Sequence, residues 1–224
     1  MRVESLTGRA AAVARGVLDV VRPHLGPLAL AFSLSAMYFI LDLRGGDLAA
    51  HLYRAELFKN DGFFVWNYNW YGGHYVVSYG VMFPTLAATI GVRLSGAFAY
   101  IAGTLLFSVL AREVFNRRGA TASAYVFAAV FSATLMIGQL PYALSVAIGL
   151  GALLAAAHAR PWIGLFLAIN CALTSPLAAL FIAFVAFTVW IAAWLPRGSQ
   201  RYGSPLANVN VFASIAQRPF LVVA

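Results

Sequence analysis

Apolar runs alternate with short polar segments along the chain. A membrane-spanning helix needs about 20 mostly apolar residues, and runs near that length recur from residue 25 onward. The last run, residues 162–194, is too long for one crossing, and we expect Asn170 and the Thr-Ser-Pro triplet at 174–176 to divide it. The spans predicted on this basis are residues 25–43, 96–111, 120–137, 143–157, 162–173 and 177–194.

A mixed segment, residues 44–95, separates the first two spans. After a Gly-Gly pair, Asp47 stands where the N-cap of a helix is expected, and this helix reaches about Lys59 with Gly62 as its stop. One stripe of the helix consists of Leu48, Leu52, Ala55 and Lys59. We therefore predict an amphipathic helix that lies on the membrane surface.

Residues 79–92 form a second apolar stretch of this segment, and the positive charges indicate where it lies. If it crossed the membrane, Arg112, Arg117 and Arg118 would lie on the side opposite to the N-terminal arginines. Because Arg and Lys collect in cytoplasmic segments, we interpret residues 79–92 as a juxtamembrane helix on the outer face.

The composition supports a membrane protein. Of the 224 residues, 62% are hydrophobic and 10% are charged, with a mean hydropathy of +0.82, whereas soluble domains carry about 25% charged residues. So few charges exclude a soluble globular protein and a disordered chain. The single cysteine, Cys171, excludes a disulfide framework and a cysteine-based metal site. The predicted fold class is an all-α, polytopic transmembrane bundle of about six spans, with juxtamembrane helices in its first outer loop.

The distribution of the net charge of +8 along the chain indicates how the chain is oriented in the membrane. In the predicted layout the outer residues 42–93 carry four positive and four negative side chains, whereas the cytoplasmic segments carry ten arginines and three acids. This excess predicts a multi-pass protein of the cell (plasma) membrane with a cytoplasmic N-terminus and argues against a nucleic-acid partner. The chain is thus divided into a basic cytoplasmic segment (1–24), a first transmembrane helix (25–43), an outer loop (44–95), further transmembrane helices (96–194) and a cytoplasmic or truncated tail (195–224).

Side chains able to do chemistry are concentrated in the outer loop. Asp47, His51 and Arg54 recur at positions i, i+4 and i+7, so a helix places them on one face. In one interpretation Asp47 is a catalytic base, and His51 and Arg54 bind a phosphate group of the substrate. The other makes Asp47 only a helix cap and pairs Arg54 with Glu56 or with lipid headgroups.

Aromatic residues are dense immediately downstream, with nine between Phe63 and Phe83. Such a group either anchors a loop at the level of the lipid headgroups or offers flat faces to a ligand. The polar side chains among them are of the kind that hydrogen-bonds sugar hydroxyls. The candidate substrate-binding residues of the outer loop are His51, Arg54, Lys59, Trp66, Asn67, Trp70, Tyr71, His74 and Arg93.

This segment resembles the first outer loop of actinobacterial members of the GT-C superfamily, polytopic glycosyltransferases that use polyprenyl-phosphate sugars. The matching features are Gly46-Asp47, the helix through His51-Leu-Tyr-Arg54-Ala-Glu56, the block Trp66-Asn67…Trp70-Tyr71-Gly72-Gly73-His74, and Ser78-Tyr79…Phe83-Pro84. The Thr-Ser-Pro turn at 174–176 is a further, weaker similarity to these proteins. Together the matching features cover residues 25 to about 195.

The resemblance implies that Asp47 is the base on the acceptor hydroxyl, and that a sugar passes from a lipid phosphate to a glycan or lipid acceptor, usually with inversion. The phosphate leaving group requires cationic neighbours, and the outer side offers Arg54, Lys59 and Arg93. Such enzymes usually have more spans and often a soluble C-terminal domain, so we expect this chain to be the N-terminal part of one. No cofactor or metal site is predicted, although some members of the superfamily use a divalent metal.

Two other functions are compatible with parts of the pattern. A non-catalytic scaffold or assembly partner in cell-envelope synthesis, in contact with another membrane subunit, would use the aromatic loop only for docking. A transporter is disfavoured, because the predicted spans contain almost no ionisable residue and transport pathways generally place some there.

Overall fold

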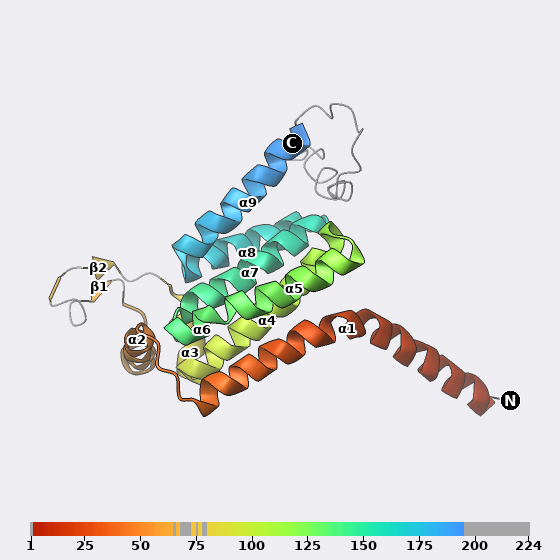
Figure 1. Ribbon diagram of the computed structural model, residues 1–224. Coiled ribbons are helices and arrows are strands. Elements are labelled where there is room, and N and C mark those ends of the chain that lie inside the picture. The colour runs from red at the N-terminus through yellow and green to blue at the C-terminus, as the bar shows by residue number, and fades with distance from the viewer. Residues whose placement is uncertain (1, 65, 68–72, 75, 78–79, 195–224) are drawn as a thin grey trace.

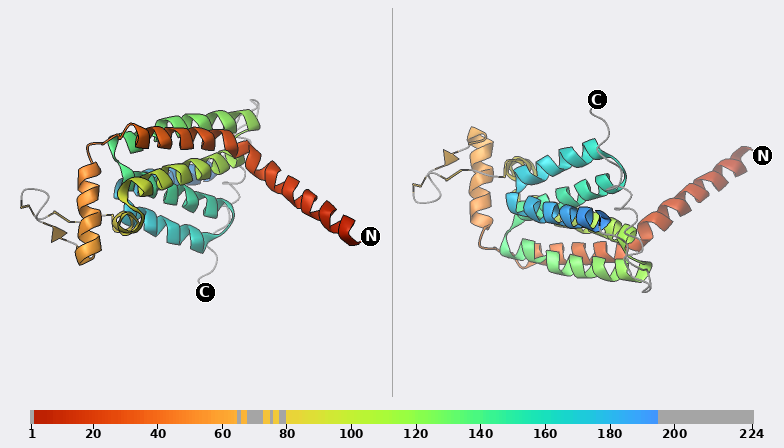
Figure 2. Two further views of the ribbon diagram at one scale, coloured as in Figure 1. Left: turned by 90° about the horizontal axis from the view of Figure 1, so that it is seen from below. Right: turned by 90° about the horizontal axis from the view of Figure 1, so that it is seen from above.

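The computed structural model describes residues 2–64, 66–67, 73–74, 76–77 and 80–194, and this part is mostly helical (Figure 1). Its elements, in chain order, are α1 (Arg2–Ile40), α2 (Leu48–Asp61), β1 (Trp66–Asn67), β2 (Val76–Val77), α3 (Met82–Ile90), α4 (Val92–Val114), α5 (Arg117–Phe131), α6 (Ala133–Ile137), α7 (Leu140–Ala157), α8 (Pro161–Thr174) and α9 (Pro176–Trp194). The long helices run alongside one another, and α2 lies across one end of the bundle (Figures 1 and 2).

In the described part, four helical stretches are long and apolar enough to cross a membrane, namely Val21–Ile40, Val92–Val114, Arg117–Ile137 and Leu140–Ala157. The apolar stretches of α8 and α9, Pro161–Thr174 and Pro176–Thr188, are shorter. The helices therefore indicate a membrane protein, and their lengths support four of the six predicted spans.

Prolines and glycines set most of the helix limits. Pro161 and Pro176 each occupy the first position of a helix, where the missing N–H costs no hydrogen bond. Gly138 ends α6 in the left-handed conformation, and Gly91 separates α3 from α4 at a φ of 89°. Asn116 caps α5, because its side chain accepts a backbone N–H of the first turn.

Helix α4 lies in the middle of the bundle and packs against α1, α5 and α7. A Cβ at Gly96 would lie 2.7 Å from the Leu140 side chain, and one at Gly103 would lie 2.6 Å from the Phe131 ring. Small residues at these positions let large side chains of neighbouring helices pack against the α4 backbone, as membrane helices commonly do. Tyr100 is fully buried there, and its hydroxyl donates to the carbonyl of Ala128 at 2.6 Å.

The structure differs from the predictions in several local features. The helix that contains the first span begins well before it, because α1 is continuous from Arg2 to Ile40. The all-α prediction missed the antiparallel pair of β1 and β2, which joins Trp66 to Val77 and Asn67 to Val76. Within the predicted α2 stripe, Leu48 and Ala55 are buried, whereas Leu52 is 51% exposed.

The outer loop is held on the bundle by direct backbone contact at Gly45. A Cβ at this position would overlap with the backbone of Ile137 and Gly138, at the link between α6 and α7. From the other side, a Cβ at Gly138 would lie 3.1 Å from the backbone nitrogen of Leu48, the first residue of α2. The start of α2 is therefore placed by a contact that requires glycine at two positions distant in sequence.

A second contact holds the loop near its other end. The backbone N–H of Val81 donates to the carbonyl of Leu173 at 2.9 Å, in the last turn of α8. A Cβ at Gly80 would lie 2.8 Å from the carbonyl oxygen of Thr174, and the φ of Gly80 is +79°. The hydrogen bond from Val81 satisfies the carbonyl of Leu173, which is one of the last carbonyls of α8 and has no partner within the helix.

Substituting Gly45 by Ala is expected to destabilise the protein by about 1–3 kcal/mol, because the new methyl group would force the loop and the α6–α7 link apart. The matched control is Gly46→Ala, since a Cβ at Gly46 meets no atom within 4 Å. Thermal unfolding of the detergent-solubilised variants measures the difference. Equal unfolding temperatures would contradict the proposed backbone contact.

Candidate functional site

Helix α2 places the candidate base at the end of the bundle. A turn closed by the hydrogen bond of the Leu48 N–H to the carbonyl of Gly45 at 3.0 Å leads into the helix, whose first turn is closed by the His51 N–H to the carbonyl of Asp47 at 3.2 Å. The helix ends at Gly62, whose φ of 84° only glycine adopts readily. Asp47 occupies the N-cap position as predicted, but its side chain makes no capping hydrogen bond and is exposed. Its carboxylate is therefore not used to cap α2.

His51 lies one turn further along the same face and is turned into the protein. Its ring packs edge-on against Phe83 with 5.6 Å between the ring centroids, and it hydrogen-bonds to the backbone of Gly138. Within the described part of the chain, its Nε2 atom is buried without a hydrogen-bond partner. His51 thus joins α2 to α3 and to the α6–α7 link.

Burial is the main reason why the pKa of His51 falls to about 4. The positive charge of Arg54 lowers the pKa further, whereas the negative charge of Asp47 and the hydrogen bond to Gly138 raise it. His51 is therefore in electrostatic range of both Asp47 and Arg54. At neutral pH the imidazole is uncharged and contributes no positive charge to an anionic ligand.

Arg54 lies where α2 faces the end of α8. Both terminal nitrogens of its guanidinium are 3.9 Å from the Cβ position of Gly80, beside the carbonyl of Thr174. It also lines a small, open pocket together with Leu57, Phe58, Gly62, Phe63, Phe64, Asn67 and Pro84. The pocket thus combines a guanidinium group with aromatic and aliphatic walls.

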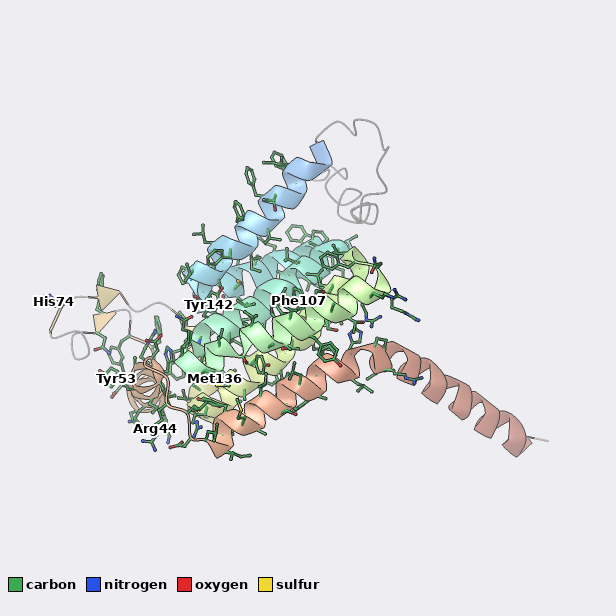
Figure 3. All side chains as sticks on the ribbon, viewed as in Figure 1. Arg44, Tyr53, His74, Phe107, Met136 and Tyr142 are labelled. Atoms are coloured by element: carbon green, nitrogen blue, oxygen red, sulfur yellow. The ribbon has the colours of Figure 1, made fainter. Side chains whose placement is uncertain are left out.

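Asn67 is held at this pocket by Tyr53 of α2. The Tyr53 hydroxyl donates to the Asn67 Oδ1 atom at 3.2 Å and accepts from its Nδ2 atom at 3.0 Å. Figure 3 shows Tyr53 on α2 and His74 far from the bundle, on the outer part of the loop. Lys59, Trp66 and His74 are exposed. Trp70 and Tyr71, also predicted as substrate-binding, lie outside the described residues.

Arg93, predicted as a phosphate ligand, is engaged at the end of α1. Its guanidinium binds Asp42 at 2.7 Å, donates to the carbonyl of Tyr38 at 2.9 Å, and lies over the rings of Tyr38 and Phe39. The hydrogen bond from Arg44, together with the charges of Arg44 and Arg93, holds the pKa of Asp42 below its usual value. These contacts assign Arg93 to the junction of α1 and α4.

The sequence does not predict the contacts of His51 with Phe83 and Gly138. Phe83 stands out only within the Phe83-Pro84 feature of the loop, and Gly138 lies 87 positions after the histidine it binds. The only hint of Gly138 is the break Gly-Gln-Leu-Pro between two apolar runs. Among the residues that the structure describes, no three His, Cys, Asp or Glu side chains gather so as to hold a metal ion.

Comparisons of the chain with protein-family models, with curated proteins and with solved structures gave no match. The functional argument therefore rests on the chemistry of Asp47, His51 and Arg54 and on the resemblance of the outer loop to GT-C enzymes.

The buried, neutral His51 makes the stability of the fold dependent on pH. Between pH 6.5 and about 4 the unfolded chain binds a proton that the folded His51 does not bind, so we expect stability to fall by up to about 3 kcal/mol as the pH drops through this range. Unfolding midpoints in detergent at pH 7 and pH 4.5 measure this loss.

The His51→Gln variant is expected to lose most of this pH dependence, and His74→Gln is the control because His74 is exposed. If the wild-type and His51→Gln proteins have the same pH dependence, His51 is not the group responsible.

Proposed function

We propose that the protein is a membrane glycosyltransferase, or the N-terminal part of one, with Asp47 as its catalytic base. It transfers a sugar from a polyprenyl-phosphate donor to a glycan or lipid acceptor of the cell envelope, on the outer side of a plasma membrane. The N-terminus is cytoplasmic in this proposal. The observation that carries it is an exposed carboxylate, not used as a cap, in electrostatic range of the same histidine as Arg54.

In the proposed step the acceptor hydroxyl attacks the anomeric carbon of the sugar. Its proton passes to the carboxylate of Asp47, and the bond between the anomeric carbon and the phosphate oxygen breaks. The leaving polyprenyl phosphate keeps the electron pair of that bond, so one unit of negative charge passes in net from the Asp47 carboxylate to the phosphate. A base positioned for this proton contributes roughly 10²–10⁴ in rate.

The charge that develops on the phosphate calls for a fixed cation. Arg54 supports this role, because its guanidinium is permanently charged, offers paired donors to phosphate oxygens and lines the aromatic pocket. The neutral His51 is a positioning residue in this proposal, since it holds α2 against Gly138. Lys59 and Trp66 remain candidates for contact with substrate at the exposed rim.

The Asp47→Asn variant is expected to lose sugar transfer by a factor of about 10²–10⁴, because the amide cannot accept the proton. Glu56→Gln is the matched control, since Glu56 is an exposed acid of the same helix whose carboxylate accepts a hydrogen bond from Asn60. Transfer of labelled sugar from polyprenyl-phosphate donors is measured in membranes that contain the full chain.

Binding of the polyprenyl-phosphate donor, followed by tryptophan fluorescence, is measured on the same proteins. Binding by the wild type that falls in Arg54→Gln but persists in Asp47→Asn supports the proposed division of roles. Absence of both donor binding and transfer in the wild type would refute the glycosyltransferase and favour a scaffold. Equal transfer by Asp47→Asn and wild type would remove Asp47 from the mechanism.

A further inference from the structure

Helix α1 is much longer than a membrane span. It contains 39 residues, of which Val21–Ile40 form the apolar stretch that can cross a membrane. The remainder, residues 2–20, is here called the N-terminal arm. In Figures 1 and 2 the arm turns away from the bundle at the end opposite α2 and stands clear of the other helices. Its direction is thus different from that of the span that follows it.

The bend is built into the junction between α1 and α4. Pro27 has no N–H to donate to the carbonyl four residues before it, which belongs to Pro23. The freed carbonyl accepts a hydrogen bond from Arg112 at 3.3 Å, and the same nitrogen of Arg112 lies 3.5 Å from the hydroxyl of Thr121. Side chains from α4 and α5 therefore stabilise the bent form of α1.

Two further contacts hold α1 immediately beside the bend. The His24 ring and the Ser108 hydroxyl are 2.7 Å apart in the buried interface with α4. A Cβ at Gly26 would overlap with the hydroxyl of Tyr125, so α1 and α5 are in close contact at this glycine. The start of the span is thus tightly held while the arm leaves the bundle.

The sequence of the arm has the pattern of a helix at a membrane surface. Apolar residues alternate at spacings of three and four, at Val3, Leu6, Ala10, Val13, Val17 and Val20. On an α-helix these positions form one stripe. Arg2 and Arg9 lie at the edge of this stripe and Arg15 lies on the other side of the helix, and these arginines outnumber the arm's two acids, Glu4 and Asp19.

The same end of the bundle is basic beyond the arm. Arg117 and Arg118 begin α5, Arg160 precedes α8, and all three are exposed. Two arms packed together would bring their arginines close to one another, whereas an anionic bilayer offers negative charge beside an apolar layer. We propose that the N-terminal arm lies along the bilayer surface and binds anionic lipid headgroups, with the bend at Pro23–Pro27 setting its direction.

The test uses two matched substitutions of the full chain, Ala10→Cys on the stripe and Ala12→Cys on the opposite side of the helix. Each thiol is labelled with a polarity-sensitive fluorophore in vesicles of phosphatidylcholine, with and without phosphatidylglycerol. The unsubstituted protein controls for labelling, because its Cys171 is buried. We expect a blue shift and quenching by brominated lipids at position 10, larger with phosphatidylglycerol, and little change at position 12.

Adding Arg9→Gln and Arg15→Gln to the Ala10→Cys protein is expected to abolish the dependence on phosphatidylglycerol, and the unfolding temperature controls for an intact bundle. Equal signals at positions 10 and 12 would overturn the surface orientation. The same signal with and without phosphatidylglycerol would overturn the anionic-lipid partner. Disulfide-linked dimers of the Ala10→Cys protein would show instead that a second copy covers the stripe.

Discussion

At its start, the outer loop lies directly against the bundle because no side chain stands between Gly45 and the backbone of residues 137–138. This contact places the first turn of α2, and the hydrogen bond of His51 to Gly138 repeats the connection one turn later. With two contacts on one side of the helix, the direction of α2 across the end of the bundle is determined. The positions of Asp47 and Arg54 depend on that direction. The geometry of the candidate site therefore follows from Gly45 and Gly138, which have no functional side chain.

The helical elements could be predicted wherever a local signal marks them. Pro161, Pro176 and Gly62 interrupt apolar or helical patterns, and helices begin or end there in the structure. The β1–β2 pair could not be predicted in this way, because each strand has only two residues and no alternation to detect. Four of the predicted spans coincide with helical stretches long and apolar enough to cross a membrane, whereas α8, with 14 residues, is shorter.

Within the candidate site, the sequence predicts which residues share a face but not which of them are buried. Helical spacing predicts that Asp47 and Arg54 both lie near His51, because that relation is local to one helix and its N-cap, and both residues are in electrostatic range of His51. The protonation state of His51 depends instead on Phe83 and Gly138, which only the tertiary fold brings to it. Arg93 illustrates the same limit, since the sequence shows its charge but not its contacts with Asp42 and Tyr38.

The hydrogen bond between Val81 and Leu173 has a consequence for the depth of the outer loop. Helix α8 has 14 residues and is thus about 21 Å long, shorter than the roughly 30 Å hydrocarbon layer of a typical bilayer. Its other end follows the exposed Arg160, which belongs near a water-facing boundary. A backbone joined to the end of so short a helix lies below the headgroups, or the bilayer is locally thinner there. If the protein is the proposed glycosyltransferase, either arrangement brings Arg54 closer to the acyl chains, and a donor with a long isoprenoid tail would approach it by lateral diffusion within the membrane.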